Sequence, residues 1–341
     1  MKPVLVMSSE RSGSNLLRRM LGAHSRVAAP PPPHLWRHLA RMAAWLGPLD
    51  DDANLRPLVQ AALRMTRVPG SHLAWRHAIP EEEVLAHLTV RSLSGVCGAL
   101  YAAYAAREGA DVWVCKENLL FDHALAIRAA FPETRVVYLC RDGRDYACSV
   151  RRVPAHGSRV FCIAEEWRDE QRRCLLVHHE LRPHGAVSLL RYEDLVTTPE
   201  PALRALCEFV DIPFEAAMLR AHERPDAAAE ASATVYWRNL GRPVLADNHG
   251  KFRRELTRRE IALFEAVAGP ELEVLGYPLV TAPRRIRAVE RLGYRLADRL
   301  AQRLARRRLL REPGRREREA MLLELEATAA AARGRLAGAL R

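Results

Sequence analysis

Residues 3–17 read PVLVMSSERSGSNLL, and this stretch decides the fold. The apolar run at 3–7 predicts a buried strand, and apolar residues recur at helical spacing over 16–21. The polar residues 8–14 between them predict a tight loop. A loop that leaves a strand and opens a helix aims free backbone N–H groups and the positive helix end at one point. The stretch therefore favours binding of a phosphate or a similar anion.

Three further β-rich runs follow, at 111–116, 134–140 and 186–190, and the first two each precede a helical pattern. Strands that alternate with helices indicate a mostly parallel, doubly wound sheet. We therefore expect an α/β fold of the P-loop-like type, in which ligands bind beyond the carboxyl ends of the strands.

Two helical additions interrupt this pattern. A long insertion at about 30–108 opens with four prolines, and we expect it to shape an acceptor site. The tail from 282 to 341 predicts an amphipathic helix, a break at Pro313-Gly314 and a second helix, and its boundary leaves a catalytic domain at 1–281. The expected apolar stripe of the first tail helix comprises Ile286, Val289, Leu292, Leu296, Leu300 and Leu304.

Composition indicates a globular chain, with 49% hydrophobic and 28% charged residues. Residues 284–341 hold 17 arginines and 7 acidic residues, so most of the net charge of +12 belongs to the tail. We expect this tail to mediate homodimerisation or a peripheral membrane contact, and we expect no nucleic acid partner. With no long apolar run and seven cysteines that form no paired motif, a cytoplasmic protein is expected, peripheral at most to the inner face of the membrane.

A second candidate anion site follows the run at 134–140. Arg141 stands at the expected carboxyl end of that strand, and Ser149 lies one to two turns into the next helix. Both side chains can therefore face the crevice beside the loop at 8–14. Two neighbouring anion sites suit a nucleotide that is phosphorylated at two places.

These motifs resemble the sulfotransferases that use 3'-phosphoadenosine 5'-phosphosulfate (PAPS), in particular bacterial enzymes of the carbohydrate and protein-tyrosine type. RSGSNLL at 11–17 is similar to the family's 5'-phosphosulfate loop, and VVYLCRDGRDYACS at 136–149 to its 3'-phosphate motif. The resemblance continues through RYEDL at 191–195, GKFRREL at 250–256 and LGY at 275–277.

The resemblance implies PAPS as cosubstrate, no metal, and a set of binding residues. The 5'-phosphosulfate would lie against the first loop, the 3'-phosphate against the second motif, and the basic turn near 251 would close over the latter. The residues implied are Arg11, Ser12, Gly13, Ser14, Asn15 and Leu16 for the first loop, Arg141 and Ser149 for the second motif, and Lys251, Arg253 and Arg254 for the turn.

Catalysis would need a cation on the leaving phosphate and a base near the acceptor hydroxyl. Arg11 stands at the family's position for the cation, and Lys116 would contact the sulfate or the acceptor. Two candidates for the base stay open: His34, which alternatively caps the helix beginning near residue 35, and Glu117, which alternatively pairs with Lys116 or another cation.

The expected reaction is transfer of a sulfuryl group to a hydroxyl of a sugar, glycolipid or small metabolite. One alternative is a P-loop kinase or nucleoside triphosphatase, but the Gly-Lys pair of the GxxxxGK[ST] motif is absent. Another is a non-enzymatic nucleotide- or membrane-binding scaffold in which the basic tail carries the function.

Overall fold

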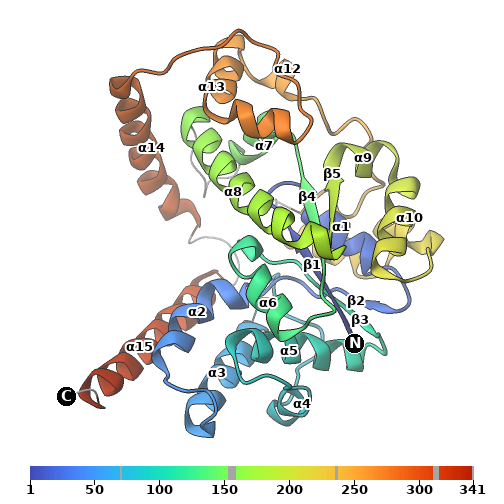
Figure 1. Ribbon diagram of the computed structural model, residues 1–341, viewed down its shortest axis with the longest axis vertical. Helices are drawn as coiled ribbons and strands as arrows, with labels where there is room; N and C mark the ends of the chain where they lie inside the picture. The colour runs from blue at the N-terminus through green and yellow to red at the C-terminus, as the bar shows by residue number, and fades with distance from the viewer. Residues whose placement is uncertain (70, 153–158, 235–236, 310–314, 340–341) are drawn as a thin grey trace.

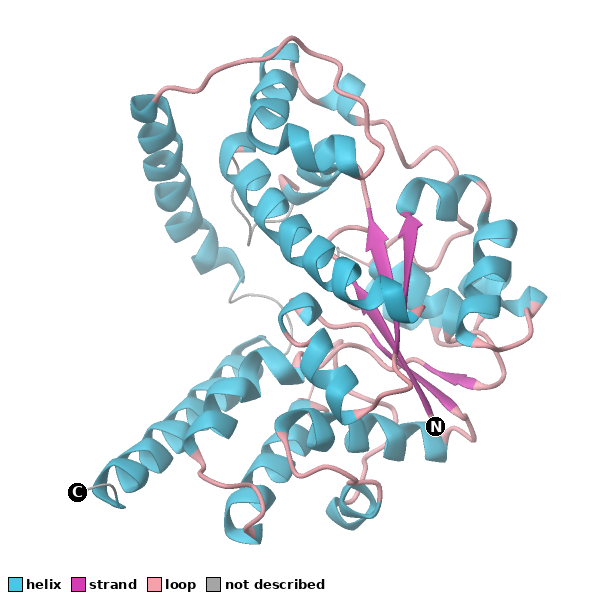
Figure 2. Cartoon of the chain, in the orientation of Figure 1, coloured by secondary structure: helices cyan, strands magenta, loops and turns pink. Residues whose placement is uncertain are grey.

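The computed structural model describes residues 1–69, 71–152, 159–234, 237–309 and 315–339. Within these ranges a parallel five-stranded sheet has the order β2-β3-β1-β4-β5, and helices cover both of its faces (Figures 1 and 2). The strands are β1 (Lys2–Met7), β2 (Val27–Ala28), β3 (Val112–Cys115), β4 (Arg135–Cys140) and β5 (Val187–Arg191). The predicted doubly wound parallel sheet is therefore confirmed.

The helices lie between the strands and after the last of them. The first helix is α1 (Ser14–Leu21), and the interval between β2 and β3 holds α2 (Leu35–Trp45), α3 (Asp52–Met65), α4 (Glu81–Ala86) and α5 (Leu93–Arg107). Later helices are α6 (Ala124–Ala130), α7 (Gly143–Val150), α8 (Val160–Leu181), α9 (Tyr192–Thr197), α10 (Pro199–Val210), α11 (Ala227–Ser232), α12 (Phe252–Glu255), α13 (Arg258–Val274), α14 (Ala288–Leu309) and α15 (Arg315–Ala339).

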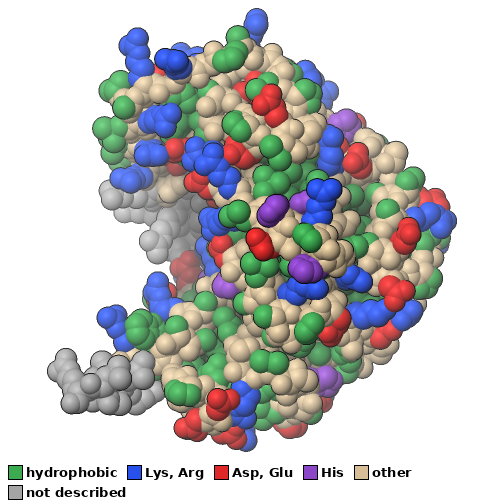
Figure 3. All heavy atoms as spheres, viewed as in Figure 1, with side chains coloured by type: hydrophobic (Ala, Val, Ile, Leu, Met, Phe, Trp, Pro, Cys, Tyr) green, Lys and Arg blue, Asp and Glu red, His purple; other side chains and the backbone are tan. Residues whose placement is uncertain are grey.

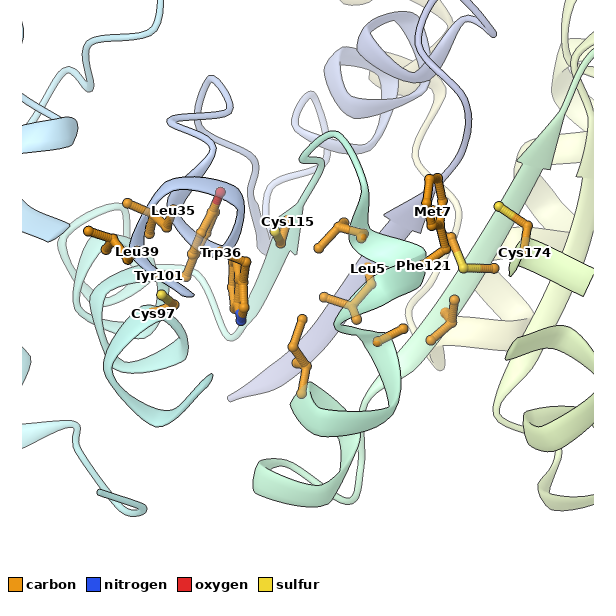
Figure 4. Packing of buried hydrophobic residues seen from close by; sticks show 14 of the residues in the cluster. Leu5, Met7, Leu35, Trp36, Leu39, Cys97, Tyr101, Cys115, Phe121 and Cys174 are labelled. Atoms are coloured by element: carbon orange, nitrogen blue, oxygen red, sulfur yellow. The ribbon is translucent and has the colours of Figure 1, made fainter. Parts of the chain in front are cut away.

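Alternate side chains of β1 enter two different hydrophobic layers, because successive residues of a strand point to opposite faces of the sheet. Val4 and Val6 pack with residues of α1 and α10. Leu5 and Met7 pack with residues of α2, α5 and α8 on the other face, as Figure 4 shows for part of that cluster. A strand buried on both sides explains why the run at 3–7 is continuously apolar.

The four strands expected from the sequence correspond to β1, β3, β4 and β5. The edge strand β2 was missed. It contains only two residues, Val27 and Ala28, which pair with Val112 and Trp113 of β3. A two-residue strand has no periodicity of its own, so only the neighbouring strand reveals it.

The tail forms two helices, as expected, while the predicted break at 313–314 lies outside the described residues. Helix α15 packs along α2 and buries Met321 and Leu325 in the core. Helix α14 contacts α8, where the rings of Tyr294 and Phe161 stack 5.3 Å apart. The α14 stripe instead faces outward at Val289, Leu292, Leu296 and Leu300, each at least half exposed.

All seven cysteines are free, and six of them are buried, so most of them serve as small apolar core residues. Among the described residues, no helix is both long enough and apolar enough to cross a membrane.

Candidate active site

The loop between β1 and α1 turns sharply at two residues with positive φ. Arg11 has φ of 60° and Gly13 has φ of 89°, directly before the first turn of α1. The hydroxyl of Ser12 and Oδ1 of Asn15 are buried and have no hydrogen-bond partner in the described structure. Buried polar atoms are nearly always satisfied, so unpartnered ones at a helix N-terminus indicate a site built for a ligand.

The other two members of this predicted loop set differ in exposure. Ser14 is buried at the start of α1, whereas Leu16 is half-buried and packs against the core layer below α1. Leu16 therefore lies beside the loop as an apolar surface rather than as a hydrogen-bonding group.

Arg141 joins the two predicted anion-binding motifs. Its Nη1 donates to the carbonyl oxygen of Arg11 over 3.1 Å, and Nη2 donates to the carbonyl of Asn248 over 3.0 Å. The guanidinium carbon lies 4.4 Å from the centre of the Tyr192 ring, an arrangement typical of a cation–π contact. Its Nε is buried and has no partner among the described residues, so one donor is left for a ligand.

Ser149 completes the junction. Nε of Arg11 donates to the Ser149 hydroxyl over 3.4 Å, across 138 residues of sequence. Since Ser149 lies on α7, which follows β4, the carboxyl ends of β1 and β4 bring the two motifs together. Tertiary structure thus unites the residues that the sequence predicted separately.

The basic turn before α13 is tied to the same region by its backbone. The amide of Phe252 donates to Oδ1 of Asp145 over 2.8 Å, and the segment begins at Asn248, the partner of Arg141. Of the three predicted basic residues, Lys251 is half-buried, while Arg253 and Arg254 are exposed. The turn therefore lies next to Arg141, but none of these three side chains forms a hydrogen bond with Arg141 in the described structure.

Lys116 lies at the end of β3, on the other side of β1. It is 5% exposed, and its Nζ donates to Oδ1 of Asn118 over 2.8 Å. Asn118 in turn donates its side-chain amide to Glu10 of the first loop. Burial, opposed in part by Glu10, lowers the pKa of Lys116 to about 8. This lysine is therefore a cation that can lose its proton just above neutral pH.

His34 precedes α2 with φ of 63°, and its side chain does not cap that helix. Instead, the backbone N–H of Asn118 donates to Nδ1 of His34 over 3.3 Å. Burial lowers the pKa of His34 well below its usual 6.5, and the positive charges of Lys116 and Arg318 lower it further. The ring is consequently neutral at pH 7, with a lone pair on Nδ1 directed at the end of β3.

Glu117 faces away from Lys116 and toward the start of α2. Its Oε2 accepts the backbone N–H of Trp36 over 3.4 Å, and its Oε1 accepts the hydroxyl of Tyr101 over 3.1 Å. The residue is 1% exposed, and burial raises its pKa to about 7. The alternative role, pairing with Lys116, is not made as a hydrogen bond, because Lys116 donates to Asn118 instead.

The sequence model of the sulfotransferase family matches residues 3–216, which include both anion-binding motifs. The chain belongs to the sulfotransferase family. The sequence resemblance assigned two regions of this family member to the nucleotide, the loop at 8–14 and the segment from Arg141 to Ser149. These two regions meet in the structure at Arg11.

Solved structures share the fold of this sulfotransferase-family chain. The sulfotransferase domain from the curacin biosynthetic pathway superposes with a TM-score of 0.54 at 18% identity, covering 81% of this chain and 98% of that domain. The sulfotransferase domain from the Synechococcus PCC 7002 olefin synthase gives a TM-score of 0.51 at 18% identity, with 87% and 94% covered.

A curated relative is an uncharacterised protein of Aquifex aeolicus (strain VF5), which is 26% identical over 240 residues. The match covers 68% of this chain and 28% of the relative, so the chain spans little more than a quarter of that protein's length.

Sequence reasoning missed several residues that shape the site. Asn118 links Lys116, His34 and the first loop, and Asn248 binds both Arg141 and the hydroxyl of Tyr192. The sequence offered one signal for Asn118, its position just after a predicted strand. For Asn248 it offered none, because its backbone carbonyl, not its side chain, meets Arg141.

Proposed function

We propose that this chain transfers a sulfuryl group from PAPS to a hydroxyl of a sugar, a glycolipid or a small metabolite. The observation that carries the proposal is the junction at Arg11, where two anion-binding motifs from different strands meet. Ser12 Oγ and Arg141 Nε are both buried there without a partner in the described structure. Donors in two adjoining places fit a nucleotide with a 5'-phosphosulfate and a separate 3'-phosphate.

In this proposal the loop residues 11–15 hold the 5'-phosphosulfate, and Arg141 with Ser149 holds the 3'-phosphate. Leu16 lies against the nucleotide, and Lys251, Arg253 and Arg254 supply positive potential on the 3' side. Arginine suits this role because its planar guanidinium keeps its charge and presents several N–H donors in fixed directions. PAPS itself supplies the sulfuryl group.

The transfer forms a bond between the acceptor oxygen and sulfur and breaks the bond between sulfur and the bridging phosphate oxygen. Arg11 stabilises the negative charge that develops on the leaving phosphate, as fixed cations do in phosphoryl transfer, and Lys116 contacts the sulfuryl group in transfer. The acceptor hydroxyl loses its proton to Nδ1 of His34, which is unprotonated at pH 7 and gives up the hydrogen bond from the Asn118 N–H as it takes the proton.

We favour His34 over Glu117 as the base because of geometry. Both carboxylate oxygens of Glu117 accept hydrogen bonds from Trp36 and Tyr101, and the side chain is almost fully buried. In contrast, His34 is half-buried, and the one hydrogen bond that its ring makes within the described structure, from the Asn118 N–H over 3.3 Å, is long enough for an acceptor hydroxyl to compete with it. Glu117 then anchors the start of α2 and so supports His34 indirectly.

The acceptor is proposed to enter through a cavity of about 310 Å³ between α1 and the helical insertion. Its lining includes Arg18, Pro30, Trp75 and Tyr104. Arg18 donates a hydrogen bond to the carbonyl oxygen of Ala29. This part of the cavity wall is therefore formed by residues that shortly precede His34 in the sequence. The wall combines aromatic rings and arginines with the carboxylates of Glu108, Asp226 and Glu230, and such a wall suits a polar molecule with hydroxyl groups and an apolar face.

The test is binding of 3'-phosphoadenosine 5'-phosphate (PAP), with AMP and ATP as comparators. Wild-type protein should bind PAP at least about tenfold more tightly than either comparator, and Arg141→Ala should remove that preference. Arg135→Ala is the matched control, since Arg135 lies at the opposite end of the same strand. Equal or tighter binding of ATP by the wild type would contradict the proposal.

We further propose that the exposed face of α14 rests on an anionic lipid surface at the cytoplasmic side of a membrane. The face combines Leu292, Leu296 and Leu300 with exposed arginines such as Arg291 and Arg299, and Figure 3 shows basic and hydrophobic side chains next to one another over this helix. Apolar residues flanked by arginines complement a negatively charged membrane better than a second copy of the same basic helix.

A further inference from the structure

The C-terminal helix reaches the candidate active site. Helix α15 lies alongside α2 (Figure 1), and Arg318 stands one turn before Met321 on the face that α15 buries. Arg318 is 7% exposed, although arginine is rarely buried to this extent unless it has a partner. A buried cation is weak evidence for stability, so its position calls for another explanation.

The partner of Arg318 is a backbone carbonyl next to the proposed base. Nη2 of Arg318 donates to the carbonyl oxygen of Pro33 over 2.7 Å, while Nη1 has no partner among the described residues. Burial, with repulsion from Arg315 and Arg37, lowers the pKa of Arg318 to about 10. The guanidinium therefore stays charged at pH 7 despite an environment that disfavours it.

The turn that Arg318 contacts is strained. His34 has φ of 63°, in the left-handed region that non-glycine residues rarely adopt. Such a conformation is unfavourable for a residue with a Cβ atom and persists where the surroundings hold it in place. Three hydrogen bonds from separate segments do so here. Arg318 donates to the carbonyl oxygen of Pro33, and the indole N–H of Trp75 donates to the carbonyl oxygen of Pro31 over 2.8 Å. The backbone N–H of Asn118 donates to the ring of His34.

We propose that Arg318 is a positioning residue for His34: from the C-terminal helix it fixes the Pro33–His34 turn so that Nδ1 faces the end of β3. The inference rests on the proposed function, in which His34 takes the acceptor's proton. It gives α15 a role in the reaction in addition to covering α2.

Three cations near His34 lower its pKa: Lys116, Arg318 and Arg37. The neighbouring His38 is neutral at pH 7, because burial lowers its own pKa to about 4. Replacing Arg318 by methionine removes both a nearby charge and the hydrogen bond to Pro33, whereas lysine keeps the charge and can donate to the same carbonyl. The tautomer of His34 separates the two effects, because it depends on the contact between Nδ1 and the Asn118 amide rather than on charge alone.

The first experiment is nitrogen NMR of protein with ¹⁵N-labelled histidine, with the His34 signals assigned from His34→Gln. In the wild type, Nδ1 should be unprotonated and Nε2 protonated at pH 7. Arg318→Met should produce a mixture of tautomers, Arg318→Lys should retain the wild-type pattern, and Arg316→Met should change nothing, since Arg316 is exposed on the same helix. A wild-type Nδ1 that carries the proton, or an unchanged pattern in Arg318→Met, would overturn the inference.

The second experiment is a double-mutant cycle on the rate of PAP release from PAPS, measured with Arg318→Met, His34→Gln and both together. If Arg318 acts through His34, the double variant should be no slower than His34→Gln alone, within about a factor of two. Additive losses would show that Arg318 acts elsewhere and would overturn the inference.

The outcomes distinguish this inference from the proposed function. Full activity of His34→Gln would refute the assignment of His34 as base, and failure to prefer PAP over ATP would refute the donor site. Loss of activity in His34→Gln with normal activity in Arg318→Met would refute only the positioning role. Should Arg318→Met fail to fold, the wild-type tautomer and the Arg318→Lys variant still decide the question.

Discussion

Gly13 lies so close to Tyr192 that a Cβ atom built on Gly13 would be 2.3 Å from Cδ2 of the tyrosine ring. The same glycine has φ of 89°, which disfavours any other residue. The ring that restricts Gly13 also lies against Arg141, so this contact sets the spacing between the two anion-binding motifs.

Replacing Gly13 with alanine should therefore weaken PAP binding by roughly tenfold or more, because the loop must move away from Tyr192 or adopt another backbone conformation. Isothermal titration calorimetry measures the change. Gly109→Ala is a matched control, since Gly109 has φ of 67° but no atom within 4 Å of an added Cβ. Equal PAP affinity of the Gly13→Ala variant and wild type would refute the importance of this contact.

Arg11→Ala should slow sulfuryl transfer by roughly a hundred- to a thousandfold, the scale found for loss of one donor to a developing oxyanion. PAP affinity should fall much less, because Arg141 and the loop amides remain. The rate is measured as PAP release from PAPS in single-turnover experiments. A near-normal rate would show that another cation stabilises the leaving phosphate.

The pH dependence of kcat/KM should report Lys116. Its pKa is lowered to about 8 by burial, so the side chain is cationic below that pH and neutral above it. Since the cation is needed on the transferred group, kcat/KM should fall as pH rises through about 8, and Lys116→Arg should remove that decline. The same alkaline limb in the Lys116→Arg variant would assign the titration to another group.

Glu117 should make the free energy of unfolding fall as pH rises, whereas a carboxylate that is ion-paired at the surface makes it rise. Burial raises its pKa from 4.5 to about 7, so the folded protein binds more protons than the unfolded chain between these values. Its contribution to the free energy of unfolding therefore falls as pH rises from about 4.5 to 7, by on the order of 3 kcal/mol.

Urea unfolding of wild type and Glu117→Gln at pH 5 and pH 7.5 measures this effect. The wild type should lose stability relative to the variant between the two pH values, because glutamine has no proton to release. A stability difference that is the same at both pH values would mean that Glu117 keeps its ordinary pKa in the folded protein.

Helix α14 should bind vesicles that contain phosphatidylglycerol and not vesicles of phosphatidylcholine alone, with binding that weakens as salt is raised. The double variant Leu292→Asn/Leu296→Asn should reduce cosedimentation with the anionic vesicles by roughly tenfold. Size-exclusion chromatography of both proteins provides the alternative outcome. A wild-type dimer that dissociates in the variant would identify the apolar face as a homodimer interface instead.

The sequence by itself determined the sheet and its binding edge. The run at 3–7 is apolar throughout because β1 is buried on both faces, and the loop that follows carries the glycine and polar residues that an anion site needs. Arg141 and Ser149 could be paired with that loop because both follow a strand, and parallel strands present their carboxyl ends at one edge. Local pattern was sufficient for these residues.

Only the tertiary structure decided how the catalytic candidates differ. His34 and Glu117 are both titratable residues beside an element boundary, and nothing local shows that Glu117 turns to the start of α2. The contact of Arg318 with Pro33 joins residues 285 positions apart. The pKa of a buried group depends on which distant side chains surround it, and this depends on the packing between segments. A sequence pattern with a period of two or 3.6 residues does not encode that packing.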